Sequence, residues 1–207
     1  VVAPGVDRVV EYDLETQAEL RRYSIAVSAT AAAYSPSGER LVVFTGDKGK
    51  DSAGNEIYIW NTVDGEQVAR ERVSGLVRSI AYTQDGKTLF VGTSTGVLAE
   101  LDAETGRGLG TLQSDELYRK ARGMGLTAHR GSVKGLAFSH DYEVLYTVSQ
   151  GAMEWSCELR LWDMKTRSPL RPPILRPYKL DGIAFSPDGT HFCLATEAGV
   201  VEVWSRE

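Results

Sequence analysis

Residues 127–166 read TAHRGSVKGLAFSHDYEVLYTVSQGAMEWSCELRLWDMKT, and this stretch decides the fold. A polar lead-in around His129 is followed by two apolar runs, 135–138 and 144–147, which a polar turn separates. A third run, 159–163, alternates apolar and polar residues. Short apolar or alternating runs bounded by turn residues are typical of β-strands. The stretch therefore predicts three short strands joined by turns and loops.

Looser copies of this stretch recur along the chain in two interlocked series. The first is an alternating strand that ends in a large residue before a turn, and its large residues are Tyr12, Trp60, Leu101, Trp162 and Trp204. The second is a hairpin turn of the small-aromatic-Ser/Thr type, often with Pro and Gly, which accept the φ angles of tight turns. It occupies residues 33–38, 81–86, 137–142 and 184–189. Repeats of this length, built of short strands, indicate propeller blades.

The quoted motifs resemble the WD40-repeat family across essentially all 207 residues: AFSPDG at 184–189, LRLWD at 159–163, and the Ala-His pair before the strand at 135–138. The resemblance implies an all-β, WD40-type β-propeller with antiparallel four-stranded blades, in which each repeat supplies strands d, a, b and c. We expect a single partial propeller over residues 1–207, with a leading strand c, preceded by the tail of a strand b, and about four repeats. The expected blades are 1–16 (partial), 17–64, 65–105, 106–166 and 167–207.

Four repeats and a leading strand do not complete the usual seven-bladed ring. An open arc leaves an unpaired strand edge or a bare sheet face at each end, which natural proteins normally cover. We therefore expect the remaining blades to belong to the same parent protein, of which this chain is a part, or to come from a completing chain.

Composition excludes several classes of function. With 42% hydrophobic and 25% charged residues, the chain has the profile of a soluble globular protein. A net charge of −5 and scattered basic residues argue against a dedicated nucleic-acid surface. No apolar run reaches the roughly 18–20 residues needed to cross a bilayer. Cys157 and Cys193 lack metal-ligand spacing and are expected to be reduced. The sequence thus predicts a cytoplasmic protein without a membrane partner.

The family resemblance implies a buried hydrogen-bonded network in the best-preserved repeat. His129, Thr147 and Trp162 match three of its members, while the Asp position falls on Gly151. We expect His129 to be structural, because a buried imidazole needs hydrogen-bond partners for stability. A Gly-rich phosphate loop, G-x-S-x-G, H-E-x-x-H and C-x-x-C are all absent from the sequence. No catalytic residue, metal or cofactor is predicted.

The insertions point to a binding face. In a WD40 blade the b-c and d-a connections lie on the top face, and the three long connections here, 46–56, 113–131 and 150–158, are of these types. Long loops on one face of a rigid scaffold commonly bind partners. Met153 and Trp155 lie in such a loop, where Trp155 either anchors a partner or folds onto its own blade. The candidate partner-binding residues are Arg78, Arg122, Arg130, Met153, Glu154, Trp155 and Lys179, whose basic members would steer acidic partners.

Together these features predict a non-catalytic protein–protein interaction scaffold in a larger multiprotein assembly. The order of the repeats is similar to that of the propeller subunit i family of eukaryotic translation initiation factor 3, which implies a docking subunit of an initiation complex. One alternative is a sensor propeller in a multidomain effector protein. Another is a propeller enzyme with a metal or small-molecule site in its channel, but the inner segments 31–33 and 135–137 supply no carboxylate or His for it.

Overall fold

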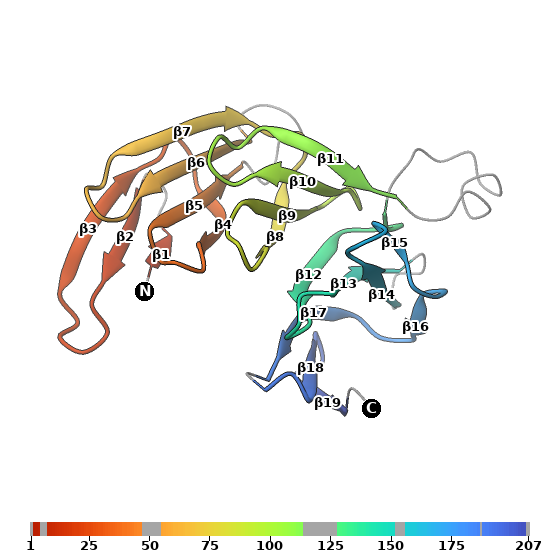
Figure 1. Ribbon diagram of the computed structural model, residues 1–207. Helices are drawn as coiled ribbons and strands as arrows, with labels where there is room; N and C mark the ends of the chain where they lie inside the picture. The colour runs from red at the N-terminus through yellow and green to blue at the C-terminus, as the bar shows by residue number, and fades with distance from the viewer. Residues whose placement is uncertain are drawn as a thin grey trace.

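The computed structural model describes residues 2–4, 8–46, 55–113, 128–151, 156–186 and 188–205. Within these residues the fold is all-β and consists of antiparallel sheets joined by turns. Five sheets follow one another around an open arc, with the two chain ends on different sheets (Figure 1). The chain is thus an incomplete propeller, as the repeat pattern predicted. A helix of the length and hydropathy needed to cross a bilayer does not occur among the described residues.

The sheets are numbered here in chain order. Sheet I contains β1 (Val2–Pro4), β2 (Arg8–Tyr12) and β3 (Glu19–Ser24). Sheet II contains β4 (Ala29–Tyr34), β5 (Arg40–Thr45), β6 (Glu56–Asn61) and β7 (Gln67–Arg72). Sheet III contains β8 (Val77–Tyr82), β9 (Thr88–Thr93), β10 (Leu98–Asp102) and β11 (Gly108–Leu112).

Sheet IV contains β12 (Val133–Phe138), β13 (Val144–Gln150), β14 (Cys157–Asp163), β15 (Ser168–Pro169) and β16 (Ile174–Arg176). Its outer strand is divided, because β15 and β16 both pair with β14 and the proline-rich segment between them leaves the ladder. Pro lacks the N–H that a continuous ladder requires. Sheet V contains β17 (Leu180–Phe185), β18 (His191–Thr196) and β19 (Val201–Ser205).

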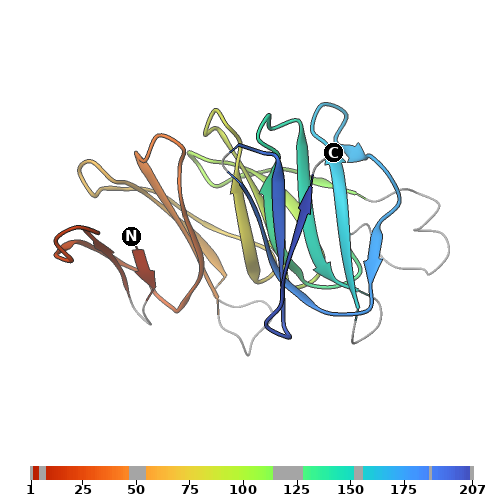
Figure 2. The same ribbon diagram turned by 90° about the horizontal axis from the view of Figure 1, so that it is seen from below.

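The inner strands β4, β8, β12 and β17 pack against one another in sequence, so that the sheets fan out from a common centre (Figure 1). Figure 2 shows the same sheets at right angles to this view, from below. Each sequence repeat spans two sheets: β7 forms the outer edge of sheet II, and the chain then continues into β8, β9 and β10 of sheet III. The first described residues, β1, pair with β2 as the tail of a strand b.

The hydrophobic core is a series of four layers between neighbouring sheets. Strands alternate their side chains, so the central strands of a sheet are buried on both faces. In β5, Val42 and Phe44 pack toward sheet III, whereas Leu41 and Val43 pack toward sheet I. Two further layers join sheets III and IV and sheets IV and V. Each sheet therefore depends on its neighbours for burial, which is the physical basis of repeat architectures.

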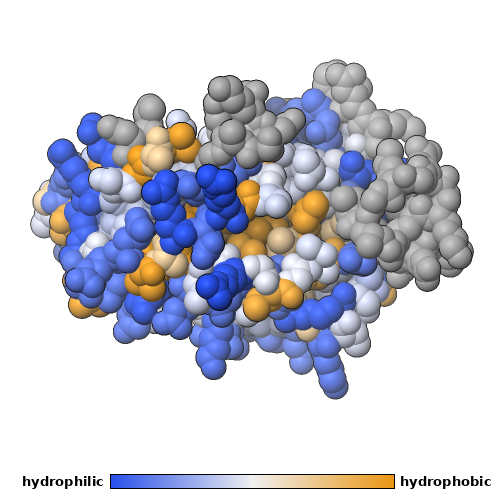
Figure 3. All heavy atoms as spheres, turned by 90° about the horizontal axis from the view of Figure 1, so that it is seen from above, coloured by the Kyte–Doolittle hydropathy of each residue, from blue (hydrophilic) through white to orange (hydrophobic). Residues whose placement is uncertain are grey.

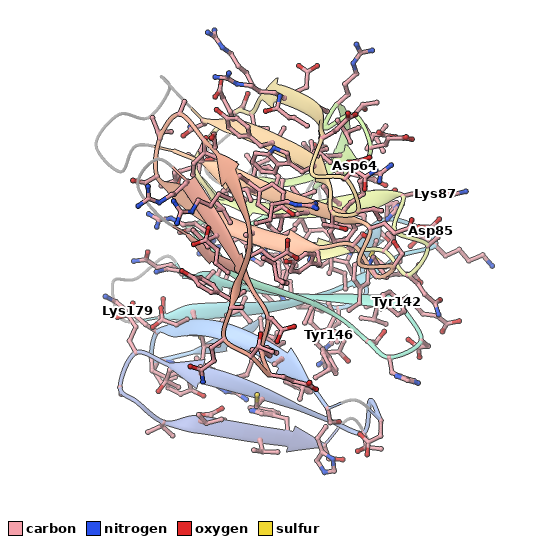
Figure 4. The ribbon with its side chains drawn as sticks, turned by 90° about the vertical axis from the view of Figure 1, so that its left-hand side faces the viewer. Asp64, Asp85, Lys87, Tyr142, Tyr146 and Lys179 are labelled. Carbon is pink, nitrogen blue, oxygen red and sulfur yellow. The ribbon has the colours of Figure 1, made fainter. Side chains whose placement is uncertain are left out.

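The two ends of the sheets carry different connections. Hairpin turns such as those with Asp85 and Tyr142 lie at one end, and Lys179, in the connection that leads into β17, lies at the other (Figure 4). Tyr142 adopts a φ of +57° at the turn position where the neighbouring sheets have Gly38, Gly86 and Gly189. We call the end with Lys179 the top, following the blade nomenclature above.

Candidate functional site

The structure brings His129, Thr147 and Trp162 together inside sheet IV. The indole Nε1–H of Trp162 donates to Thr147 Oγ1 over 2.9 Å. Thr147 Oγ1 lies 2.6 Å from His129 Nε2, and its hydroxyl hydrogen is free to donate there because its lone pair already accepts from the indole. All three side chains are buried, and Thr147 and Trp162 are 0% exposed. The network joins the segment that precedes β12 to strands β13 and β14.

The other imidazole nitrogen faces residues that the sequence comparison with WD40 repeats did not anticipate. Ser149 Oγ lies 2.7 Å from His129 Nδ1, and Glu158 Oε2 lies 3.5 Å from the same atom. Since Nε2 accepts from Thr147, the proton of the neutral ring belongs on Nδ1, which donates to Ser149. The sequence predicted no partner on this side of the histidine, because the Asp position of the network falls on Gly151. Ser149 and Glu158 occupy this side instead.

Glu158 forms the centre of a buried charge cluster at the top of sheet IV. Its Oε2 accepts from Arg160 Nε over 3.3 Å, and its Oε1 lies 3.8 Å from Arg130 Nε. Glu158 and Arg160 are 1% and 4% exposed. Buried charges are tolerated when they are paired and hydrogen-bonded. The cluster therefore fixes the start of β14 against the segment that carries His129.

The protonation states follow from this burial. Burial lowers the pKa of His129, while the hydrogen bond and charge of Glu158 work in the opposite direction. Burial alone would raise the pKa of Glu158, but the hydrogen bond with His129 and the charge of Arg160 outweigh it, and the net result is a lowered pKa. The site thus contains a neutral imidazole and an ionised carboxylate. Both are sealed from solvent, so the arrangement supports the fold and offers no surface to a substrate.

The same segment also connects neighbouring sheets. The backbone N–H of His129 donates to the carbonyl oxygen of Gly96 in sheet III over 3.0 Å. Gly96 has a φ of +84°, and a Cβ at this position would lie 2.4 Å from the His129 carbonyl oxygen. A side chain larger than hydrogen therefore does not fit where the two sheets meet.

The candidate partner-binding residues that the structure describes lie at the top ends of the inner strands. Arg78 is exposed at the start of β8, Arg130 precedes β12 and Lys179 precedes β17. Lys179 Nζ lies 3.3 Å from a carboxylate oxygen of Glu197, and Arg130 faces Glu158. The basic rim expected from the sequence is therefore partly neutralised within the chain. Arg122, Met153, Glu154 and Trp155 lie outside the described residues, as do the central parts of the three long connections.

Sequence reasoning missed Ser149, Glu158 and Arg160. A signal was present, because two charged residues alternate with leucines in a strand whose neighbours are apolar. In the part of the chain that the structure describes, three or more His, Cys, Asp or Glu side chains do not gather closely enough to hold a metal ion. Cys157 and Cys193 are both free thiols.

Comparison with known proteins agrees with this architecture. Residues 122–163, which contain the histidine network, match the model of the WD domain, G-beta repeat. The chain thus contains a WD40 repeat, and its similarity to the relatives below extends beyond that repeat. Among solved structures, Kuenenia stuttgartiensis hydrazine synthase resembles it with a TM-score of 0.75 at 14% identity, over 97% of this chain and 57% of that one. At this identity the likeness concerns the fold alone.

Two kinds of curated relative were found. Telomerase protein component 1 of Rattus norvegicus is 28% identical over 185 residues, and the protein of the same name from Mus musculus is 28% identical over 186. The periodic tryptophan protein 2 homolog of Schizosaccharomyces pombe is 31% identical over 80 residues, or 39% of this chain. The chain spans only 9% of the length of the fission yeast relative and 6% of that of the rodent relatives.

Proposed function

We propose that this chain is a non-catalytic protein–protein interaction scaffold within a larger multiprotein assembly, and that residues 1–207 form one partial propeller. The observation that carries the proposal is the outward face of sheet V. It occupies the same place in its sheet as the faces that sheets II and IV bury against their neighbours.

The strand registers show this equivalence. In sheet II, Val42 pairs with Ile59, and both residues are buried in the layer against sheet III. In sheet IV, Tyr146 pairs with Leu161 in the layer against sheet V. The corresponding pair in sheet V is Cys193 and Val203.

In sheet V, however, this face is open. Val203 is 70% exposed and Val201 is 61% exposed, and Ala184 beside Cys193 is also exposed. The opposite face of the same strands is packed against sheet IV through Phe192 and Leu194. Exposed apolar side chains that form a continuous sheet face mark an interaction surface.

A further propeller sheet is the occupant that fits this face best. The exposed side chains are small, which leaves room for the bulky residues that fill the other layers, such as Phe44 of sheet II. This sheet would come from the remaining blades of the parent protein or from a completing chain. That the curated relatives are more than ten times longer than the matched segment supports the first source.

Protein partners would bind at the top face, through the connections 46–56, 113–131 and 150–158. Arg78 supports this assignment, because it is exposed at the top of an inner strand. The rodent relatives are named as a component of telomerase, which supports a role as one component of an assembly. Translation initiation factor 3 is the assembly that the order of the repeats favours, and the cytoplasm is the corresponding location.

The proposal is tested by isolating the tagged chain from the cells that make it and by measuring its partners with quantitative mass spectrometry. Val203→Glu places a charge on the open face, and Val63→Glu is the matched control, since Val63 is 74% exposed in the turn between β6 and β7. We expect the control to keep all partners and Val203→Glu to lose those that cover sheet V. Undiminished recovery of the same partners by Val203→Glu would contradict the proposal.

The top-face assignment has its own test. A charge reversal at Arg130 combined with Trp155→Ala should reduce the recovery of top-face partners while leaving the contact at sheet V intact. If all partners are still recovered in full, the top face is not their binding site.

A further inference from the structure

A groove lies between the outer strands of sheets II and III. It encloses a cavity of about 560 Å³, and its lining combines the end of β7 and the segment after it, residues 72–74, with the length of β11, residues 108–111. Valine, alanine and leucine side chains form its floor: Val77, Val91, Val97, Ala99 and Leu101. In Figure 3, apolar atoms gather in a hollow on this side of the molecule, with hydrophilic atoms beside it.

The size and lining of the groove suit an apolar ligand with a negative charge. Ligand pockets in proteins commonly have volumes of about 300–1,000 Å³, with apolar walls and a few polar groups. Arg72 is the one charged residue among those that line this cavity, and it is exposed. Arg107, also exposed, lies between the lining residues Gly106 and Gly108. Neither guanidinium closes a salt bridge with another described residue.

Strand β11 is an edge strand that could pair with an additional strand. It is the outermost strand of sheet III and pairs only with β10 among the described strands. Proteins protect such edges with charges or prolines. Strand β3 has Glu19, Arg21 and Arg22, and strand β7 also carries arginines, whereas β11 reads GLGTL without a charge or a proline.

The register of β11 places its side chains in relation to the groove. Thr111 pairs with Ala99, whose side chain packs on the layer between sheets II and III. Leu112 points the other way and is buried against sheet IV. The pairing with β10 shifts between Gly110 and Gly108, so Leu109 is the extra residue of a β-bulge. It lines the cavity together with Thr111 and is 57% exposed. A strand added to β11 would direct every second side chain over the cavity.

We propose that this groove binds an extended segment of a partner protein as an additional strand on β11. Apolar side chains of the segment enter the cavity, and an acidic side chain pairs with Arg72. Strand addition supplies main-chain hydrogen bonds, and pockets for alternate side chains supply specificity. The site is separate from the open face of sheet V, and it reaches the top of the sheets only at its end, where residues 73–74 lie. It relies on the proposed function only in that its ligand is a protein segment.

The test uses a random ten-residue peptide library displayed on phage and selected against the intact 207-residue chain. The selected peptides are synthesised with a fluorescent label, and their affinities are measured by anisotropy for the wild type and three variants. Leu109→Lys places a charge on the groove face of the edge strand, and Arg72→Glu reverses the rim charge. Leu20→Lys is the matched control, because Leu20 is 59% exposed on edge strand β3.

We expect enriched peptides with alternating apolar residues and an acidic residue. Leu109→Lys should weaken their binding at least about tenfold, as loss of a central contact does, Arg72→Glu should also weaken it, and Leu20→Lys should have no effect. Unchanged thermal unfolding of the variants would show that the losses are local. Failure to enrich such peptides, or equal binding by Leu109→Lys, would overturn the proposal. Because purified chain and peptides are used, this result is independent of the co-purification that tests the proposed function.

Discussion

The hydroxyl of Thr147 holds the histidine network together, and Thr147→Val tests its contribution. Valine has the shape of threonine but cannot accept from Trp162 Nε1 or donate to His129 Nε2. Both partners would stay buried without a hydrogen bond, at a cost of about 1–3 kcal/mol each, so the free energy of unfolding should fall by about 2–6 kcal/mol. That is a large part of the roughly 5–15 kcal/mol that stabilises a typical protein.

Thr147→Ser is the control for this substitution. It keeps the hydroxyl and removes one buried methyl group, which costs about 1 kcal/mol. Equilibrium unfolding in urea at neutral pH, followed by tryptophan fluorescence and circular dichroism, would measure both variants. If Thr147→Val destabilises the protein no more than Thr147→Ser does, the hydrogen bonds contribute little, and His129 is held by packing alone.

Three further predictions concern the sheet contacts, the histidine and the thiols. Gly96→Ala should destabilise the protein by about 1–3 kcal/mol more than Gly38→Ala. Both glycines have a positive φ, but only at Gly96 would a Cβ clash with another group, the His129 carbonyl oxygen. Equal urea midpoints for the two variants would contradict this prediction. In the folded state the pKa of His129 lies below its usual 6.5, so the unfolded state takes up the proton first as pH falls. The free energy of unfolding should therefore decrease below about pH 6.5, by at most about 1.4 kcal/mol per pH unit. Urea midpoints that stay constant down to about pH 5 would refute this prediction. A thiol reagent should modify the partly exposed Cys193 and spare Cys157, which is buried and has its pKa raised by burial to about 11. Mass spectrometry of the treated native protein would show the reverse pattern if this is wrong. In the assembly, Cys193 should be protected from the reagent.

The repeat pattern predicted the fold because its signals are local. Alternating strands and turn residues act within a few positions, so the hairpin turns, and the tail of a strand b before β2, followed from the sequence. The His129 contacts to Thr147 and Trp162 followed from the family pattern, since each residue has a fixed place in a repeat.

The polar side of the network did not follow from the sequence. Alternation in β14 separates Glu158 and Arg160 from the leucines, but it does not reveal that both faces of this strand are covered. That depends on sheet III and on the segment carrying His129, which lies 29 residues before Glu158 in the chain. The groove beside β11 was likewise hidden, because it is formed by outer strands of two sheets whose separation no local pattern determines.

The offset between repeats and sheets affects how such a chain can change in length. Each repeat begins with the outer strand of one sheet and continues with three strands of the next, as β7 and β8–β10 do. An in-frame duplication or deletion of a whole repeat would therefore leave every sheet with an outer strand and every layer with two faces. The unit that evolution can copy is thus different from the unit that folds, and the arc can grow or shrink without exposing a new edge inside it.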